Sequence, residues 1–379
     1  MVTGFKQTEV GLIPEDWDVK TIDYCADIVG GGTPSTFNPK YWNGKINWFT
    51  PTEVGTKKFL NESNRKITEE GYSNCSAKML PAGTILLTSR AGIGDLGILT
   101  VESCTNQGFQ SLIPKDNSDG DFLYYLVGSL KNELLKNASG STFLEISPGK
   151  LKAIQVPLPP TKAEQTAIAT ALNDADAIIT ALEKLIAKKK AIKQGTMQEL
   201  LKPKTGWETK KLGDFLNYEQ PTKYIVQNTD YNDHNQTPVL TAGKSFILGY
   251  TNEEFGIFEN LPVIIFDDFT TDKKFVNFIF KVKSSAMKIL KPKKETNLRF
   301  IYELMQTIEF DSTDHKRYWI SEYQKIEVSV PNPDEQIRIA QILSDMDSEI
   351  EALEQKLKKQ KQIKQGMMQV LLTGKVRLV

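Results

Sequence analysis

The sequence predicts an α+β protein in which two globular domains are separated by two long antiparallel coiled-coil helices, arranged as a pseudo-twofold repeat. Residues 164–201 return at 335–372 with a constant offset of 171 and no gap, and 21 of the 38 aligned pairs are identical. Both copies have helical periodicity, and each follows a long segment of different sequence. We therefore expect globular domains at 1–158 and 203–330, and long helices at 159–202 and 331–379.

An apolar seam in each repeat predicts that the two helices pack on each other. Its residues alternate spacings of four and three, which is typical of a left-handed coiled coil. The seam loses phase at Lys189 and Gln360, and beyond these residues Gly195 and Gly366 occupy equivalent positions. Because a glycine inside a helix costs about 1 kcal/mol, we expect a close approach by another helix there, or a local break. The seam residues are Ile168, Leu172, Ala175, Ile179, Leu182 and Ile186, then Ile339, Leu343, Met346, Ile350, Leu353 and Leu357.

Each long helix follows a short strand pattern and a proline-rich stop. Apolar residues alternate over 154–158 and again over 326–330, as in a half-buried strand. Thr161 and Asp334 are the expected helix caps. A smaller repeat, Trp17–Ile22 and Trp207–Leu212, places a tryptophan after the first helix and another near the chain start. The second helix should therefore end near the N-terminal region, which makes the layout circular.

The segments between the helices have the patterns of small α+β domains. Strand patterns occur at Gly83–Ser89, Gly97–Val101 and Leu261–Phe266, and helical patterns come late, at Phe122–Lys136 and Leu298–Ile308. The two segments share this plan but little sequence. Two domains with a similar arrangement of elements but different surfaces should bind two different targets.

Charge and cysteine content limit the possible functions. Forty-seven basic residues balance 47 acidic ones, so no overall basic field indicates nucleic-acid binding, and any such contact must come from local patches. Cys25, Cys75 and Cys104 form no metal-binding or disulfide pattern, which suggests free thiols in a reducing compartment. No apolar segment resembles a signal peptide or a membrane span. We expect a cytoplasmic protein without a membrane partner.

No motif in the sequence predicts a catalytic site, a metal site or a bound cofactor. The GxGxxG pattern at 92–97 leads into a strand pattern, which favours a turn over a dinucleotide site. Gly243–Ser245 resembles the end of a phosphate-binding loop, but Pro238 replaces the required glycine. Asp267, Asp268 and Asp272 are spaced too closely for a nuclease pattern and are interpreted as loop charges.

The candidate DNA-binding residues lie in loops that mix glycine, hydroxyl, amide, basic and aromatic side chains. Arginine pairs with guanine and asparagine or glutamine with adenine in the major groove, whereas lysine mostly contacts phosphate. For any single residue, an ordinary turn or surface role remains the more common outcome. The candidates are Thr33, Ser35, Lys40, Tyr41, Trp42, Arg90, Asn106 and Gln107 in the first domain, and Lys223, Tyr224, Thr241, Lys244, Ser245, Lys273, Lys274, Arg317 and Tyr318 in the second.

A second candidate surface lies where the helix seam loses phase. This stretch has more apolar side chains than the packing of the two helices would bury, and we expect a partner protein to cover the remainder. Lysines on a helix more often face solvent than form a contact surface, and this is the more common expectation for the lysines of this stretch. The predicted partner-binding residues are Ile192, Gly195, Met197, Leu200, Ile363, Gly366, Met368 and Leu371.

The chain resembles the specificity subunit of type I restriction–modification systems over essentially its whole length. The most specific resemblance is the pair of helix ends, Ile192-Lys-Gln-Gly195-x-Met-Gln198-x-Leu-Leu201 and Ile363-Lys-Gln-Gly366-x-Met-Gln369-x-Leu-Leu372. Gly31-Gly-Thr-Pro34 with Tyr41-Trp42, and Thr105-Asn-Gln-Gly108, are similar to one type of target-recognition domain in that family. The second domain, with Thr241-Ala-Gly-Lys244 and Phe266-Asp-Asp268, is similar to another.

This resemblance implies that each target-recognition domain reads one half of an asymmetric bipartite site in double-stranded DNA. Two modification subunits, which hold S-adenosylmethionine, would form an adenine-N6 methyltransferase with this chain, and restriction/translocase subunits would add ATP- and magnesium-dependent cleavage. The chain itself would be a non-catalytic subunit. A helix of forty residues spans about 60 Å, enough to hold two readers of half-sites that lie about 34–36 Å apart.

Three alternatives remain open from the sequence. The chain could serve a system in which methylation and cleavage share one polypeptide. It could be a coiled-coil scaffold for protein partners, in which case no DNA would bind even with a methyltransferase partner. A self-contained nuclease or methyltransferase is the third, and weak cofactor binding by the purified chain would favour it.

Overall fold

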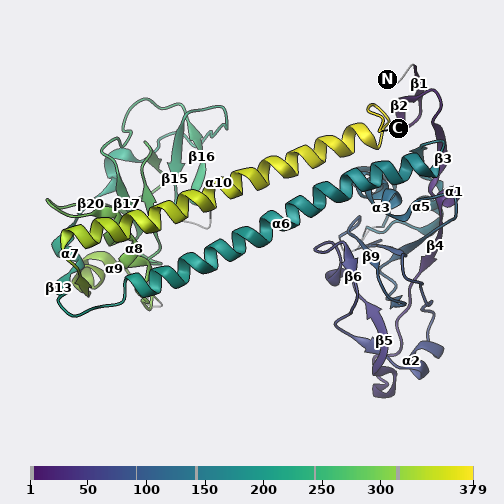
Figure 1. Ribbon diagram of the computed structural model, residues 1–379, viewed down its shortest axis with the longest axis horizontal. Helices are drawn as coiled ribbons and strands as arrows, with labels where there is room; N and C mark the ends of the chain where they lie inside the picture. The colour runs from purple at the N-terminus through teal and green to yellow at the C-terminus, as the bar shows by residue number, and fades with distance from the viewer. Residues whose placement is uncertain (1–3, 91, 141–143, 243–244, 313–315, 379) are drawn as a thin grey trace. The chain divides into compact units, whose positions relative to one another are not determined.

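The computed structural model describes residues 4–90, 92–140, 144–242, 245–312 and 316–378. The chain forms two compact units, of which the first is assembled from two separate stretches of sequence (Figure 1). The first unit combines Met1–Leu182 with Lys356–Val379, and the second is Glu183–Gln355. Each unit therefore contains one globular domain together with part of both long helices. No helix in these ranges is long and apolar enough to cross a membrane.

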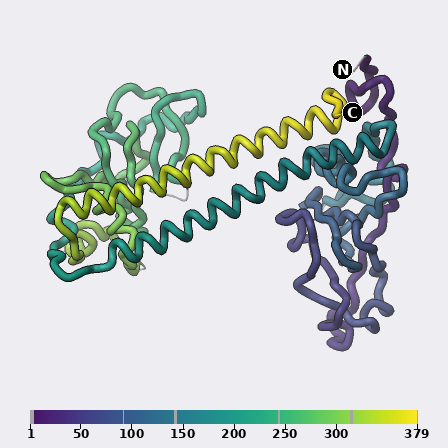
Figure 2. The backbone as a smooth tube through the Cα atoms, in the orientation of Figure 1, coloured from purple at the N-terminus to yellow at the C-terminus, as the bar shows by residue number. Residues whose placement is uncertain are grey.

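The two long helices repeat each other in length and position. Helix α6 is Lys162–Leu200 and helix α10 is Pro333–Leu371, each of 39 residues. Figure 2 draws both as long continuous coils. Inside the first unit, Ile168 and Leu172 of α6 share a core with Leu371 and Leu372 at the end of α10. Inside the second unit, the roles are exchanged, because Met197 and Leu201 share a core with Ile339 and Leu343. The beginning of one helix thus packs with the end of the other in each unit.

Of the two expected helix caps, one is confirmed and one is wrong, and the expected role of the two helix glycines is also wrong. Thr161 does cap α6, since its hydroxyl accepts from the Glu164 amide at 3.2 Å. The second cap is Asn332 instead of Asp334, because α10 already begins at Pro333, and Asn332 Oδ1 accepts from the Glu335 amide at 2.9 Å. Gly195 and Gly366 neither break their helices nor touch another helix, since a Cβ built on either would meet no atom within 4 Å.

The first unit is built from three sheets and a hairpin. A five-stranded sheet has the order β4-β11-β8-β9-β6, a three-stranded sheet β10-β5-β7, and the pair β12-β3 lies at the start of α6. The strands are β1 Phe5–Thr8, β2 Gly11–Pro14, β3 Asp18–Thr21, β4 Ala26–Gly30, β5 Trp42–Phe49, β6 Phe59–Leu60, β7 Lys66–Ile67, β8 Ile85–Leu87, β9 Leu96–Leu99, β10 Cys104–Thr105, β11 Gln110–Pro114 and β12 Gln155–Leu158. The helices are α1 Ile22–Cys25, η1 Pro39–Tyr41, η2 Pro51–Glu53, α2 Glu69–Ser73, α3 Gly120–Ser129, α4 Lys131–Asn137 and α5 Pro148–Ala153.

The second unit shares with the first a strand followed by a four-residue helix (β3 and α1, β13 and α7) and a last strand before the long helix (β12, β21), but its sheets differ. A four-stranded sheet has the order β14-β20-β17-β18, a three-stranded sheet β16-β15-β19, and the pair β13-β21 matches β3-β12. The strands are β13 Glu208–Lys211, β14 Leu216–Glu219, β15 Thr237–Leu240, β16 Ile247–Thr251, β17 Val263–Asp267, β18 Lys273–Val276, β19 Lys281–Val282, β20 Met287–Pro292 and β21 Glu327–Val330. The short helices are α7 Leu212–Phe215, η3 Pro221–Tyr224, α8 Leu298–Gln306, α9 Tyr318–Ser321 and η4 Tyr323–Lys325.

The expected strand and helix patterns appear with one change. The helix expected at Phe122–Lys136 is divided at Leu130 into α3 and α4, beside Gly128 and Ser129, which are weak helix formers. The glycine-rich pattern at 92–97 is a turn between the antiparallel strands β8 and β9, with positive φ at Gly92 and Gly94. The turn interpretation is confirmed.

The end of the chain lies against its beginning inside the first unit. A Cβ on Gly374 would lie 2.5 Å from Pro14, and the guanidinium of Arg377 donates to Asp16 at 2.9 Å and to the buried Glu164 at 2.7 Å. Trp17 is fully buried in the same core as Leu372. The predicted circular layout is confirmed.

Candidate functional site

The first candidate site is the loop that leaves β4 and leads into β5. Its backbone is laid directly against the end of β10, because the Gly32 amide donates to the Thr105 carbonyl at 2.9 Å. A Cβ on Gly31 would lie 2.0 Å from the Asn106 carbonyl oxygen, and one on Gly32 would lie 2.4 Å from the Ala77 nitrogen. These two positions require glycine because the backbones approach too closely for any side chain.

Two buried tryptophans hold this loop in place. The indole nitrogen of Trp48 donates to the Gly32 carbonyl at 2.8 Å, and that of Trp42 donates to the Ser35 carbonyl at 3.1 Å. Their rings meet edge to face with centroids 5.0 Å apart, and the Arg65 guanidinium covers the Trp42 ring at 3.7 Å. Trp42, predicted as a binding residue, is 9% exposed. Its contacts show a supporting role for its ring.

The loop brings together the two sequence motifs predicted for this surface. The Thr33 hydroxyl donates a close hydrogen bond to the side-chain oxygen of Gln107, and both residues are exposed. Arg90 is half-buried next to them in the fold, because the Ser89 amide donates to the Gly108 carbonyl at 2.8 Å. The Asn106 side chain is occupied by the turn, since its oxygen accepts from the Gly108 amide at 2.8 Å.

The remaining predicted residues of the first domain lie along the same loop. Ser35 and Lys40 are exposed, and Tyr41 is half-buried. The Thr68 hydroxyl donates to the Lys40 carbonyl at 2.8 Å, so the Lys40 backbone is fixed while its side chain faces solvent. The exposed polar groups of this surface are therefore Thr33, Ser35, Lys40 and Gln107.

The predicted residues of the second domain do not form one surface. Thr241 and Lys274 line a cavity of about 150 Å³ together with Asp267 and Asp272. Lys273 is next in β18 and points to the other face of the strand, where its Nζ lies 3.3 Å from the buried Tyr323 hydroxyl. Burial lowers the pKa of Lys273. Lys274 is thus the exposed cation of that strand.

The other residues of this group divide into exposed and structural ones. Lys223, Ser245 and Arg317 are exposed. Tyr224 packs edge to face on Phe258 at 5.0 Å and donates to Glu219 at 2.8 Å, and its pKa is raised by burial and by that bond. Tyr318 is 1% exposed. Lys244 lies outside the described residues.

Two of the three aspartates that could suggest a nuclease, Asp267 and Asp268, are buried in the fold, so their interpretation as loop charges is wrong. Asp268 and Lys288 are both 1% exposed and form an ion pair at 3.2 Å, and the second oxygen of Asp268 accepts from the Trp319 amide at 2.8 Å. Asp267 accepts from the Phe269 amide at 2.9 Å. Among the described residues, no cluster of histidine, cysteine, aspartate and glutamate could hold a metal ion.

The ends of the long helices present a mixture of covered and exposed apolar groups. Ile192 and Ile363, which are equivalent in the repeat, are each 44% exposed. Met197 and Leu371 are buried at 5% and 3%, so the expectation that they need a partner to cover them is wrong. Each is covered by the core of its own unit, because the last turns of a long helix pack on the globular domain. Leu200 is half-buried in the second core.

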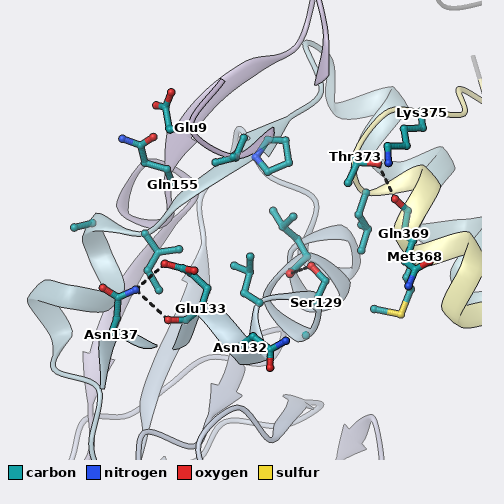
Figure 3. A pocket seen from close by; sticks show the side chains of 18 of the residues that line it. Glu9, Ser129, Asn132, Glu133, Asn137, Gln155, Met368, Gln369, Thr373 and Lys375 are labelled. Carbon is teal, nitrogen blue, oxygen red and sulfur yellow. Dashed lines mark hydrogen bonds between the residues drawn. The ribbon is translucent and has the colours of Figure 1, made fainter. Parts of the chain in front are cut away.

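A large cavity opens beside the end of α10 in the first unit (Figure 3). Its volume is about 1130 Å³, and Met368, Gln369 and Thr373 of the chain's end face residues of α3, α4 and β12 across it. The lining is mixed, with Ser129, Asn132, Glu133 and Lys375 beside Leu126 and Leu372.

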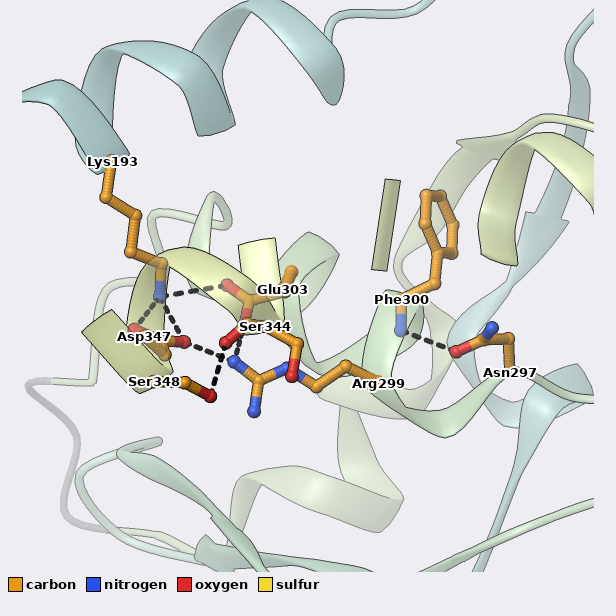
Figure 4. A network of polar contacts seen from close by, with 8 residues as sticks. All are labelled: Lys193, Asn297, Arg299, Phe300, Glu303, Ser344, Asp347 and Ser348. Atoms are coloured by element: carbon orange, nitrogen blue, oxygen red, sulfur yellow. Dashed lines mark hydrogen bonds and ion pairs between the residues drawn. The ribbon is translucent and has the colours of Figure 1, made fainter. Parts of the chain in front are cut away.

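An ion-pair network joins both helices to the globular domain inside the second unit (Figure 4). Lys193 of α6 contacts Asp347 of α10 at 2.6 Å and Glu303 of α8 at 3.5 Å, and Arg299 of α8 pairs with the same two carboxylates. In the first unit, Lys364 of α10 contacts Asp176 of α6 at 2.6 Å, and Asp176 accepts from the Tyr125 hydroxyl of α3 at 2.6 Å. The lysine–aspartate pair therefore occurs in both units, but the globular domain of each unit contributes different side chains to it.

Two α+β domains with different sheets and loops, each built on equivalent stretches of a repeated helix, define a two-module recognition protein. The family model for the type I restriction modification DNA specificity domain matches residues 14–194 and again residues 204–365. The chain belongs to this family, as the resemblance of its helix ends implied.

Known proteins of the same kind match parts or all of the chain. The MjaIX specificity subunit of Methanocaldococcus jannaschii is 39% identical over 245 residues, which are 57% of this chain and 55% of that subunit. The chain thus matches about half the length of this relative. The EcoR124I/EcoR124II specificity subunit of Escherichia coli is 53% identical over 129 residues, 32% of each chain. The MjaX subunit, a putative specificity subunit, is 24% identical over 99% of this chain and 97% of its own length.

A solved structure supports the fold. The S subunit of a type I restriction–modification system from M. genitalium has a TM-score of 0.63, with 18% identity, and the match covers 94% of this chain and 96% of that one. At this identity the match describes the fold alone.

Proposed function

We propose that this chain is the DNA sequence-specificity subunit of a type I restriction–modification complex and that it has no catalytic role of its own. One observation carries the proposal: the specificity-domain match occurs twice, and each copy covers one of the two globular domains. A protein that must read two different half-sites needs two modules of one design with different contact loops. The loops within residues 31–107 and 223–317 differ in sequence, so the two domains can contact different half-sites.

Each domain reads one half of an asymmetric bipartite site in double-stranded DNA. In the first domain, the exposed Thr33, Gln107 and Lys40 combine hydroxyl, amide and cationic groups on a loop that is held by Trp42 and Trp48. Amides and hydroxyls can discriminate base edges, whereas lysine contacts phosphate. In the second domain, Lys223, Lys274 and Arg317 are the exposed cations of the predicted set.

The two helices form an antiparallel coiled coil that sets the spacer between the half-sites. The predicted seam supports this, because Ile179, Leu182 and Ile186 of α6 and Ile350 of α10, which belong to neither globular core, are each at most 9% exposed. Seam residues that are buried at heptad spacing are the packing surface of a coiled coil. A continuous helix is also a stiff connection between two modules.

The chemistry belongs to partner subunits. Two modification subunits that carry S-adenosylmethionine would methylate adenine at N6, and restriction/translocase subunits would supply ATP- and magnesium-dependent cleavage. The exposed Ile192 and Ile363, the open positions at Gly195 and Gly366, and the cavity beside Met368 support docking of the modification subunits at the helix ends.

The test is a map of methylated adenines in cells that express this chain with its modification subunit. We expect a bipartite motif that disappears when this chain is omitted. A partner that carries methylation and cleavage on one polypeptide would give the same map and would be identified by its size in the purified complex. If the assembled complex neither methylates nor binds any duplex, the chain is a protein scaffold and the proposal fails.

A further inference from the structure

We propose that Phe37 is a wedge that inserts into a base step of the DNA half-site read by the first domain, and this inference rests on the proposed function. Phe37 is 96% exposed. The next most exposed large hydrophobic side chain among the described residues is Ile337, at 58%. An aromatic ring that is almost entirely exposed adds little to the stability of the fold and leaves a large apolar surface free to contact a ligand.

The segment that carries Phe37 is a closed turn. The Asn38 amide donates to the Ser35 carbonyl at 3.4 Å, which places Thr36 and Phe37 at the two central positions of a β-turn. The same Ser35 carbonyl accepts from the Trp42 indole at 3.1 Å, and the Asn38 side chain accepts from the Lys40 amide at 3.2 Å. The turn is therefore held from both sides, and the phenyl ring is presented by an ordered backbone.

The surroundings of Phe37 fit nucleic acid better than a protein pocket. From Ile28 to Thr52 the sequence has no acidic residue and has Lys40 and Lys45. Phe37 is also the only large hydrophobic residue of that segment that is exposed in the described structure. Protein interfaces are organised around clusters of apolar anchors, whereas DNA wedges are single apolar side chains among polar and basic contacts.

The neighbouring polar groups determine which part of the duplex the ring would meet. Phe37 lies four residues from Thr33, whose hydroxyl is bonded to Gln107 on the proposed reading surface. Lys40 follows three residues later, with its side chain in solvent. Thr33 and Gln107 would contact base edges and Lys40 would contact a phosphate, so the ring between them in the loop would lie against the stacked bases. Insertion would partly unstack one base step, with the lost stacking replaced by contact with the ring.

The experiment uses the full chain assembled with its modification subunit and a duplex that contains the mapped site. Fluorescent analogues, 2-aminopurine for adenine and pyrrolocytosine for cytosine, are placed singly along both half-sites and the spacer. We expect enhanced fluorescence at one step other than the methylated adenine, because an analogue brightens when it loses its stacking neighbour. Phe37→Ala should abolish that signal and weaken binding about tenfold.

Two further variants separate the wedge from a general loss of structure. Phe37→Leu keeps an apolar wedge and should retain most of the signal. Phe59→Ala, at a phenylalanine of β6 that is 56% exposed, should change neither signal nor affinity. Both Phe37 variants should melt at the temperature of the parent, since at 96% exposure Phe37 makes no packing contact that could be lost.

The outcomes distinguish this inference from the proposed function. A tight, methylating complex without an unstacked step outside the methylated adenine overturns the wedge and leaves the proposed function intact. So does an unstacked step that persists in Phe37→Ala. If Phe37→Ala impairs only assembly with the modification subunit, the ring occupies a protein pocket and the inference is wrong. A parent complex that binds no duplex overturns both.

Discussion

The Nζ of Lys193 lies 2.6 Å from Oδ1 of Asp347, and the equivalent pair, Lys364 and Asp176, is also separated by 2.6 Å. Each pair lies inside one unit, and each joins the end of one long helix to the beginning of the other. The repeat therefore preserves a contact as well as a sequence. The side chains that the globular domains add to the pair are different. Arg299 and Glu303 contact it in the second unit, and Tyr125 contacts it in the first.

Lys193→Met should destabilise the second unit by about 1–3 kcal/mol, because it removes a cation from the fully buried Glu303 and the half-buried Asp347. Glu303 is 0% exposed, and its Oε2 accepts no hydrogen bond from any described residue while Lys193 lies 3.5 Å away. Arg299 remains to compensate part of the charge. Hydrogen exchange of the α8 amides would report this loss.

Lys364→Met is the matched control. In the first unit, Asp176 keeps its hydrogen bond from the Tyr125 hydroxyl, so we expect a smaller loss of protection at α3. Equal losses in the two units would contradict the view that the fully buried Glu303 makes the second pair the more sensitive one.

Stability should fall in alkaline solution, and Tyr302 provides a specific test. Burial, with Glu303 next in importance, raises the pKa of Tyr302 to about 12 from an ordinary value of 10.0. A raised pKa means that the folded state holds the proton more tightly, so the stabilisation is complete below pH 10 and is lost as pH rises toward 12. The difference corresponds to roughly 2–3 kcal/mol.

Tyr302→Phe should therefore flatten the decline of the second unit between pH 10 and 12, since the variant has no phenol to ionise. Unfolding free energies measured by urea denaturation at a series of pH values would show it. Both proteins keep every other ionisable group, so the comparison isolates the phenol of Tyr302. An unchanged slope would show that Tyr302 ionises as freely in the folded state as in the unfolded one.

The long helices were predictable because their residues repeat with a period that only helix packing explains. Thr161 was recognisable as a cap, but Asp334 was chosen wrongly because Pro333 starts α10 two residues after Pro331 and leaves Asn332 at the cap. The register of the two helices needs the three-dimensional structure. The identity of Lys193 with Lys364 and of Asp176 with Asp347 was nevertheless a usable signal for the ion pairs.

The loop residues were harder to assign, because the same residue types serve turns and ligands. Trp42 seemed a contact residue from its polar neighbours, yet pairing of β5 with β7 buries it beneath Arg65. Phe37 was overlooked, since a phenylalanine is usually a core residue. Its position between Pro34 and Pro39, among hydroxyl and amide side chains, was the signal that could have identified it.

Gly195→Leu combined with Gly366→Leu should leave the chain folded and weaken its assembly with the modification subunits. A Cβ at either position meets no atom within 4 Å, so neither core is disturbed, and helix propensity improves by up to about 1 kcal/mol per site. Size-exclusion chromatography with the modification subunit measures assembly. The alanine pair, Gly195→Ala with Gly366→Ala, adds little bulk and should assemble more nearly normally. Unchanged assembly of the leucine variant would remove these positions from the docking surface.

Disrupting the Thr33–Gln107 pair should relax one half-site only. Thr33→Val and Gln107→Leu keep the shapes of the side chains but remove the hydroxyl and the amide, and both residues are exposed, so the fold should be unaffected. A specific base contact contributes about 1–3 kcal/mol of discrimination, so methylation should spread to sites that differ at one base of that half-site. Lys274→Met, in the second domain, provides the comparison, because loss of a phosphate contact weakens binding without changing the motif. The readout is the map of methylated adenines. If both half-sites relax together, or neither does, the loop around Thr33 is not the reader of one half-site.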